Sequence, residues 1–205
     1  MNAEKQTYWN EVYATKGADK VSWFQPRAAM SMRLISAAGA TENSAIIDIG
    51  GGSSVLIDQL LDADFSDVTV LDISERALIG SKDRLGARAA EVGWIVSDVL
   101  AWTPARAYDI WHDRAVFHFL TDARERNTYR ATLLKGLRSG GALIFGTFAE
   151  DGPEKCSGLP VQRWSAEALA GELGPEFRLI ESLREDHRTP SGAVQPFTWA
   201  RFERV

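Results

Sequence analysis

The chain has 205 residues, a formal net charge of −5 and a hydrophobic content of 45%. This length and composition fit one globular domain with a proper core. The acidic balance argues against a general nucleic-acid surface, which would need clustered Lys and Arg. The single cysteine, Cys156, excludes an internal disulfide and a four-cysteine zinc site.

The sequence shows no targeting or membrane segment. Met1–Gln6 lacks the apolar core of a signal peptide, and no apolar run is long enough to cross a membrane. We therefore expect a cytoplasmic protein without a membrane partner, as a monomer or a homodimer. Residues 1–205 are expected to form a single domain, with an N-terminal helical and aromatic segment over residues 1–44 and a core over residues 45–205.

The first part of the chain is helical and aromatic. One helical stripe is formed by Tyr8, Trp9, Val12 and Tyr13. The aromatic segment Lys20–Pro26 follows, and a second helix is expected over Arg27–Ala38. Two interpretations stay open: the aromatic side chains pack on the edge of the sheet, or they form a lid that excludes water from the site.

The core begins with an apolar run that leads into three glycines. Ala45–Ile49 is short and rich in β-branched residues, which is typical of a buried parallel strand. Gly50–Gly52 then allow a sharp turn and the close approach of a ligand to the main chain. Either Ser53 or Ser54 is expected to cap the helix that follows.

Charge and spacing indicate the kind of ligand that this turn binds. The dinucleotide fingerprint fits Gly50 and Gly52 but fails at Val55, where a third glycine is required. A phosphate-binding Walker loop is excluded, because no Gly-Lys-Ser/Thr follows the glycines. The carboxylate of Asp48 would repel a pyrophosphate but attract an ammonium or sulfonium group, such as those of S-adenosylmethionine.

Two further strand-like runs also end in an acid. Asp67–Asp72 ends twenty residues after Gly52, where a carboxylate can bind the ribose hydroxyls of a nucleoside. Val92–Asp98 ends in the same way. Because parallel strands end at the same edge of a sheet, we expect the three acids to form one edge. The alternative is that each acid is a helix cap or a solvated loop residue.

The run Asp48-Ile49-Gly50-Gly51-Gly52 resembles the acid-x-Gly-x-Gly loop of class I S-adenosylmethionine-dependent methyltransferases, and the resemblance extends from the first strand to the end of the chain. It implies that Asp48 and the glycines face the methionine part of the cofactor, that Asp72 binds the ribose, and that Asp98 with Val99 meets the adenine. Ser54 departs from the pattern, since many members have another glycine there. The implied cofactor-binding residues are Trp23, Asp48, Gly50, Gly51, Gly52, Asp72, Ile73, Asp98, Val99 and His112.

A second resemblance follows the fourth expected strand, which ends where the sequence becomes polar at His112. Asp113-Arg114-Ala115 resembles the Asp-Arg-Ala of thiopurine methyltransferase-like enzymes, which act on sulfur-type nucleophiles. As candidate catalytic groups, Asp113 could steer a cation, Arg114 could hold a thiolate or a carboxylate, and His118 could accept a proton. The alternative is that Asp113 and Arg114 pair with each other and that His118 is a core histidine.

The rest of the chain completes the sheet. The expected elements are a helix from Ser74 through Ala89, a helix over Asp122–Leu137 capped by Thr121, a strand over Ala142–Phe148, a helix over Ser165–Leu173, and strands over Phe177–Glu185 and Phe197–Arg204. The loop Glu150–Pro160 leaves the carboxyl edge of the sheet and is predicted to cover the substrate. Cys156 in this loop is expected to be a bystander, because methyl transfer needs no covalent intermediate.

These patterns predict a Rossmann-like, three-layer α/β/α sandwich with a mostly parallel sheet of about seven strands and a C-terminal antiparallel hairpin. The resemblance implies S-adenosylmethionine as cofactor, S-adenosylhomocysteine as product and no metal. The expected function is methylation of a small nucleophile, preferably a thiol. A protein lysine methyltransferase stays as an alternative, because the N-terminal Tyr-Trp and Trp-Phe pairs resemble both thiol and lysine methyltransferases. A non-catalytic module that binds the cofactor without turnover is a further alternative.

Overall fold

The computed structural model describes residues 3–17 and 19–205, so Met1, Asn2 and Ala18 of the expected N-terminal segment lie outside the described residues. The strands of the main sheet are β1 (Ile46–Ile49), β2 (Val68–Asp72), β3 (Val92–Val96), β4 (Tyr108–Arg114), β5 (Leu137–Phe148), β8 (Phe177–Arg188) and β9 (Val194–Arg204). The α-helices are α1 (Ala3–Thr15), α2 (Ala29–Ala37), α3 (Leu56–Asp62), α4 (Glu75–Leu85), α5 (Ala123–Gly136) and α6 (Ala166–Leu173). Smaller elements are the 3₁₀ helices η1 (Gly86–Glu91) and η2 (Phe117–Phe119) and the hairpin of β6 (Lys155–Cys156) and β7 (Leu159–Pro160).

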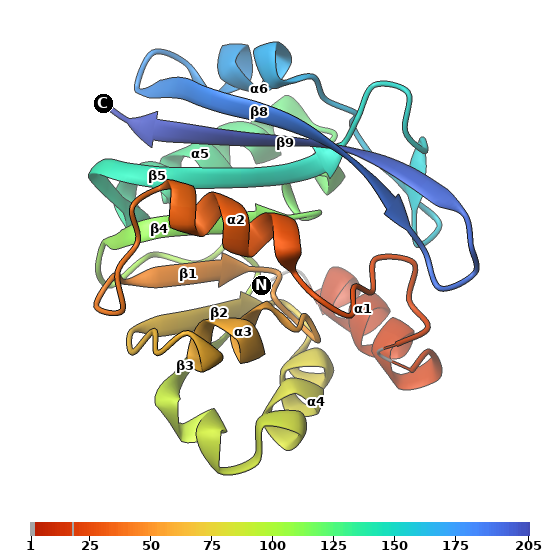
Figure 1. Ribbon diagram of the computed structural model, residues 1–205. Helices are drawn as coiled ribbons and strands as arrows, with labels where there is room; N and C mark the ends of the chain where they lie inside the picture. Colours follow the sequence, from red (N-terminus) through yellow and green to blue (C-terminus); the bar gives the residue numbers. More distant parts are fainter. Residues whose placement is uncertain (1–2, 18) are drawn as a thin grey trace.

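The main sheet has seven strands in the order β3-β2-β1-β4-β5-β9-β8 (Figure 1). The first five of these are parallel to their neighbours, whereas β9 runs antiparallel to β5 and β8 antiparallel to β9. The predicted Rossmann-like sandwich with a C-terminal antiparallel hairpin is therefore confirmed. The direction of strand succession reverses between β1 and β4, and ligands bind beyond the carboxyl ends of the strands at such a point.

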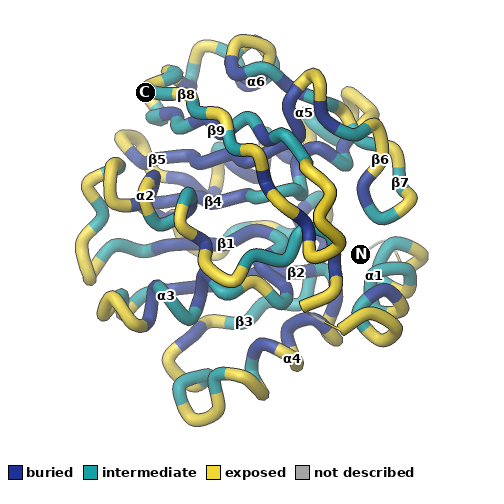
Figure 2. The backbone as a smooth tube through the Cα atoms, turned by 45° about the vertical axis from the view of Figure 1, so that its right-hand side comes forward, coloured by how far each residue is buried: buried dark blue, intermediate teal, exposed yellow. Residues whose placement is uncertain are grey.

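Two apolar layers cover the two faces of the sheet. One layer packs α5 and α6 on the sheet through residues such as Trp111, Leu133 and Leu169. The other packs α2 and α3 on the opposite face through residues such as Leu34 and Ile57. Strands β1, β2 and β4 are buried along most of their length, whereas Figure 2 shows β8 as largely intermediate or exposed. Because both faces are covered, the carboxyl edge of the sheet is the place where polar side chains can reach a ligand.

Several element boundaries differ from the sequence prediction. Helix α4 begins at its predicted cap, Ser74, but ends at Leu85 because Gly86 follows with a φ of 58°. Helix α5 is capped by Asp122 rather than Thr121, since the Asp122 carboxylate accepts a hydrogen bond from the Arg124 amide at 2.7 Å.

Strand β5 also begins earlier than predicted. The predicted strand began at Ala142, but Leu137 directly after α5 already pairs with Tyr108 of β4. Leu137 is fully buried, which explains why the chain enters the sheet there although two glycines, Gly140 and Gly141, follow. The irregular register between β4 and β5 absorbs the extra residues.

Candidate active site

A cavity of about 520 Å³ lies beyond the carboxyl ends of β1, β2, β3 and β4. Its floor is formed by residues at the ends of these strands, and its cover is formed by α1, Trp23 and the β6–β7 hairpin. Figure 1 shows α1 beyond the arrowheads of β1 and β2. The loop Glu150–Pro160, which was predicted to cover a substrate, contributes Cys156, Leu159 and Pro160 to the wall.

The glycine loop is packed so closely that side chains would not fit. Gly50 lines the cavity and has a φ of 66°, and a Cβ on it would lie 2.1 Å from Cγ2 of Val116. A Cβ on Gly52, whose φ is 39°, would lie 2.8 Å from the Asp72 carboxylate. These conformations and contacts explain the need for glycine. Gly51 and Gly52 form the turn behind the cavity wall, and Gly50 is the glycine that reaches it.

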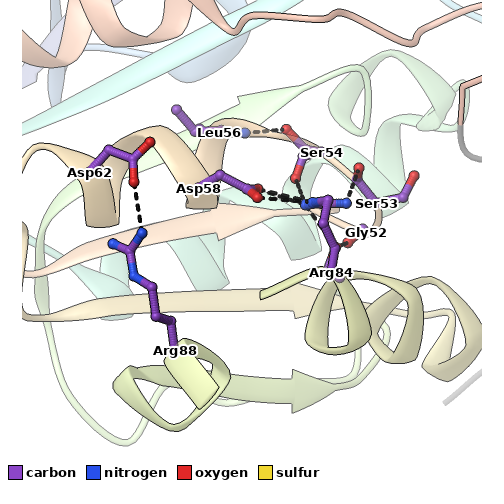
Figure 3. A network of polar contacts seen from close by, with 9 residues as sticks. Gly52, Ser53, Ser54, Leu56, Asp58, Asp62, Arg84 and Arg88 are labelled. Carbon is purple, nitrogen blue, oxygen red and sulfur yellow. Dashed lines mark hydrogen bonds and ion pairs between the residues drawn. The ribbon is translucent and has the colours of Figure 1, made fainter. Parts of the chain in front are cut away.

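Helix α4 holds the outer side of the glycine loop (Figure 3). Arg84 donates hydrogen bonds to the carbonyls of Ser53 at 3.2 Å and Ser54 at 2.7 Å, and it forms an ion pair with a carboxylate on α3. The Ser81 hydroxyl donates to the Gly52 carbonyl at 2.6 Å. These bonds to main-chain carbonyls fix the path of the loop from outside. The predicted serine cap is wrong, because the N-cap of α3 is Val55, which has no side-chain cap; Ser54, one residue earlier, accepts from the Leu56 amide at 3.1 Å.

Two of the three predicted acids line the cavity. The Asp72 carboxylate accepts a hydrogen bond from the Ser74 amide at 2.7 Å, and burial raises the pKa of Asp72 to about 7. Asp98 accepts from the Leu100 amide at 3.0 Å. Ile73, Val99 and Trp23 also line the cavity, as the resemblance implied. A nucleoside needs acceptors for its hydroxyl groups beside apolar surface for its base, and these residues supply both.

Asp48 and His112 take a different position from the one predicted. Asp48 Oδ1 lies 2.7 Å from His112 Nδ1, and His112 Nε2 lies 2.9 Å from the Ser31 hydroxyl on α2. Asp48 and His112 are 3% and 2% exposed, and neither is part of the described cavity wall. The two residues that were expected to contact the cofactor thus lie outside the described cavity wall. They form a buried polar link between β1, β4 and α2 beneath the glycine loop.

Asp113 also turns away from the cavity. Its carboxylate accepts hydrogen bonds from the Tyr129 hydroxyl at 2.6 Å, the Val116 amide at 2.9 Å and the Phe117 amide at 3.2 Å. Burial raises the pKa of Asp113 to about 6. These contacts stabilise the turn after β4, so neither the predicted cation steering nor the alternative pairing with Arg114 is seen. The reason is that three donors on the core side capture the carboxylate.

His118 is a core histidine. Its ring is fully buried between Phe119 and Phe148, with ring centroids 4.5 and 4.8 Å away, and it is absent from the described cavity wall. Burial, with a smaller contribution from the Arg114 charge, lowers the pKa of His118 to about 3. The ring is therefore neutral at physiological pH. The structure favours the core interpretation over the predicted proton acceptor.

Arg114 is the predicted catalytic residue that does line the cavity. Its Nη1 donates to the Trp23 carbonyl at 2.9 Å, and its guanidinium lies 4.8 Å from the centre of the Phe197 ring. Cys156 lines the same cavity, although it was expected to be a bystander in a loop. It is 4% exposed, and burial raises the pKa of its thiol to about 12. Cys156 is therefore a neutral part of the wall.

Helix α1 is fastened on both sides of the cavity. On the β2 side, Gln6 donates to the Ile73 carbonyl at 3.1 Å, and Asn10 accepts from the Ser74 hydroxyl at 2.8 Å. On the other side, the Tyr8 hydroxyl donates to the Ser157 carbonyl in the β6–β7 hairpin. The rings of Trp9, Tyr13 and Trp23 then pack edge to face beneath the helix. This arrangement supports the lid interpretation over simple packing on the sheet edge.

Sequence reasoning missed part of the wall. Val116 and Phe119 line the cavity because the chain turns across its mouth after β4. The apolar run that contains them was the available signal, but such a run does not reveal which side chains face a cavity. Across residues 3–17 and 19–205, no three His, Cys, Asp or Glu side chains are grouped to hold a metal ion, and no helix there is long and apolar enough to cross a membrane.

Comparisons with known proteins find similar sequences and similar folds. Residues 46–141 match the family described as "Methyltransferase domain". The chain is 27% identical over 107 residues to malonyl-[acyl-carrier protein] O-methyltransferase 2 of Ilyobacter polytropus, covering 52% of this chain and 40% of the relative. It is 30% identical over 80 residues to nodulation protein S of Rhizobium tropici, covering 39% of this chain and 33% of the relative. The chain thus spans less than half the length of these curated relatives.

Solved structures with the same fold cover nearly the whole chain. The N-methyltransferase NodS from Bradyrhizobium japonicum WM9, in complex with S-adenosylhomocysteine, has a TM-score of 0.72 at 19% identity and covers 95% of this chain and 97% of its own. A structure from work on conversion of a disulfide bond into a thioacetal group in echinomycin biosynthesis has a TM-score of 0.76 at 18% identity, covering 97% and 92%. Residues 46–141 thus resemble a methyltransferase domain, and the fold built around them is shared with a solved N-methyltransferase in complex with S-adenosylhomocysteine.

Proposed function

We propose that this protein transfers a methyl group from S-adenosylmethionine to a small nucleophile, preferably a thiol, inside the cavity beneath α1. The observation that carries the proposal is the arrangement of the wall: Asp72 and Asp98 lie at the ends of β2 and β3, and Arg114 lies across β1 at the end of β4. The same wall is covered by α1. The part of the wall with Asp72 and Asp98 thus suits a nucleoside, and the part with Arg114 suits a methyl acceptor.

The cofactor would be held by residues already described. Asp72 would accept hydrogen bonds from ribose hydroxyls, Asp98 and Val99 would meet the adenine, and the main chain at Gly50 would allow close approach. Ile73 would complete this wall. When bound, S-adenosylmethionine supplies a methyl group on a positively charged sulfur. Asp48 and His112 would act indirectly, because they support the glycine loop from below.

The protein's contribution to the reaction would be positioning and exclusion of water. Trp9 and Trp23 cover the cavity, and Tyr8 joins the cover to the β6–β7 hairpin. A thiol with a pKa near 8.5 needs little help to lose its proton, whereas a lysine near 10.4 needs a base. Since His118 and Asp113 face away from the cavity, a thiol suits this site better than an amine.

The lysine and non-catalytic alternatives make different predictions. A protein lysine methyltransferase needs an open groove for a protein chain, whereas this cavity lies beneath α1 and the β6–β7 hairpin. The relatives named as an O-methyltransferase and an N-methyltransferase support methyl transfer and differ in the acceptor atom. A non-catalytic module would bind the cofactor without turnover.

The test is transfer of labelled methyl from S-adenosylmethionine to three sets of acceptors: small thiols, hydroxylated aromatic compounds and a whole-cell protein extract. The proposal predicts label on a small thiol. Label on a protein band would favour the lysine alternative. Binding of the cofactor without label in any fraction would contradict the proposal and favour the non-catalytic module.

A further inference from the structure

Building on the proposed methyl transfer, we propose that the acceptor carries a carboxylate and that one edge of the Arg114 guanidinium binds it. The acceptor would thus be a carboxylated small molecule, such as a mercapto acid, with its nucleophile directed toward the part of the cavity proposed for the cofactor. Arg114 would be an acceptor-binding residue that sets substrate specificity.

The hydrogen bonds of Arg114 leave one edge free. Nη1 donates to the Trp23 carbonyl at 2.9 Å, whereas Nε and Nη2 are buried and have no partner among the described residues. Nε and Nη2 lie on the same side of the planar group, and together they match the two oxygens of a carboxylate. Because an unsatisfied buried donor is costly, a ligand that accepts from both would gain a charge-assisted pair.

The surroundings of Arg114 leave its charge without a direct ion pair among the described residues. The carboxylate of Glu185 is nearby, but it accepts from Gln25 at 3.0 Å and from the Trp199 indole at 2.7 Å. Asp48 also acts on Arg114 from farther away, but it is hydrogen-bonded to His112. Cys156 and His118 are neutral at physiological pH, and burial lowers the pKa of His187. Burial lowers the pKa of Arg114 to about 10, so it stays a cation.

This charge selects the sign of the acceptor. A lysine ammonium or another cationic acceptor would meet the Arg114 guanidinium as a like charge in a mostly apolar cavity. A carboxylate would instead be attracted there and repelled by Asp72 and Asp98 on the other side of β1. The two signs of charge would therefore orient an anionic acceptor in one direction.

The position of Arg114 also distinguishes the acceptor from the cofactor. Arg114 ends β4, and its neighbour in the cavity wall, Cys156, comes from the β6–β7 hairpin rather than from the strands that carry the acids. The competing idea is that Arg114 binds the carboxylate of S-adenosylmethionine itself. That idea predicts loss of cofactor affinity when Arg114 is replaced, whereas ours predicts loss of acceptor affinity.

The experiment measures two things in the full-length protein. First, kcat/KM is compared for 3-mercaptopropionate and its neutral analogue 3-mercapto-1-propanol. Second, calorimetry compares binding of benzoate and benzamide to the complex with S-adenosylhomocysteine. Both are repeated with Arg114→Gln, with Arg114→Lys, which keeps the charge but lacks the planar edge, and with the surface control Arg184→Gln, whose partner Asp151 is exposed.

We expect the wild-type protein and Arg184→Gln to prefer the carboxylate by about ten- to a hundredfold. Arg114→Gln should lose that preference while it keeps its affinity for S-adenosylhomocysteine, and Arg114→Lys should keep part of the preference. Equal binding of benzoate and benzamide by the wild-type protein would overturn the inference. So would an Arg114→Gln variant that loses affinity for S-adenosylhomocysteine but not for benzoate. If no thiol is methylated, the proposed thiol reaction fails, and the benzoate comparison still decides the role of Arg114.

Discussion

The Tyr129 hydroxyl on α5 donates a 2.6 Å hydrogen bond to the Asp113 carboxylate at the end of β4. The other oxygen of Asp113 accepts a hydrogen bond from the Val116 amide. The Val116 side chain fills the space that a Cβ on Gly50 would need. A helix on one face of the sheet is thereby connected to the glycine loop through one carboxylate. Asp113 therefore supports the shape of the cavity from outside it.

Replacing Tyr129 by Phe tests this supporting role. The hydroxyl also accepts from the Trp111 indole at 2.8 Å, so its removal leaves two buried polar groups without this partner. We expect Tyr129→Phe to lower the free energy of unfolding by about 1–3 kcal/mol. Urea denaturation measures this, with the exposed Thr128→Ala as control. Unchanged stability in Tyr129→Phe would show that the Asp113 contacts contribute little.

Gly50 tests the packing of the loop. Gly50→Ala places a Cβ 2.1 Å from Val116 at a φ of 66°, and we expect loss of S-adenosylhomocysteine binding. Gly171→Ala in α6 is the matched control, because its Cβ meets nothing within 4 Å, and it should raise stability by about 0.5–1 kcal/mol. Calorimetry with both variants checks this. Wild-type affinity in a folded Gly50→Ala would remove the loop from the proposed site.

Asp72 tests the ribose assignment. If its buried carboxylate accepts from ribose hydroxyls, Asp72→Ala should weaken binding of S-adenosylhomocysteine by about 1–3 kcal/mol. Asp62→Ala on α3, where the carboxylate is exposed and paired with Arg88, is the control and should leave the affinity unchanged. Equal affinities for Asp72→Ala and the wild type, measured by calorimetry, would refute the assignment.

The pKa of Asp72 predicts a pH dependence of stability. Burial raises this pKa to about 7, whereas an aspartate in an unfolded chain titrates near pH 3.9. Between these values the folded protein binds the extra proton, so the Asp72 contribution to stability falls as the pH rises from about 4 to about 7. Burial lowers the pKa of His118, which acts in the opposite direction. The difference in unfolding free energy between the wild type and Asp72→Asn therefore isolates the contribution of Asp72 to the pH dependence.

Urea denaturation at about pH 5 and about pH 7.5 measures that difference. Asp72→Asn should gain stability relative to the wild type at the higher pH, because the wild type must then hold a buried charge. A difference between the two proteins that does not change with pH would contradict the assigned shift.

Removing α1 tests the lid. Deletion of residues 1–16 leaves the sheet intact and retains the Trp23 carbonyl that binds Arg114. We expect a folded protein with weakened cofactor binding and no methyl transfer, because water then enters the cavity. The control is Glu11→Ala on the exposed side of α1. Full activity after the deletion would show that α1 is a packing element.

Much of the fold was readable from local patterns. The strand before the glycines and the strand ending in Asp72 were predicted because short apolar runs ending in an acid are visible in the sequence itself. The cap Ser74 was equally local, since its hydroxyl accepts from the Ala77 amide three residues later. Such features depend on neighbours along the chain.

The direction of the side chains after β4 was not readable. Successive side chains of a strand point to opposite faces, but both faces of β4 are buried, so no alternation of polar and apolar residues marks them. Asp48 meets His112 because the parallel register of β1 and β4 places them side by side. The register between two strands cannot be read from one sequence. For this reason Asp48, His112 and Asp113 were predicted to face the ligand.

The most direct test of the site is a calorimetric titration of the wild-type protein with S-adenosylhomocysteine and, separately, with NADH. The acids at the ends of β2 and β3 predict stoichiometric binding of S-adenosylhomocysteine, and the missing third glycine at Val55 predicts no binding of NADH. Binding of NADH in place of S-adenosylhomocysteine would contradict the account, because the cavity would then belong to a dinucleotide.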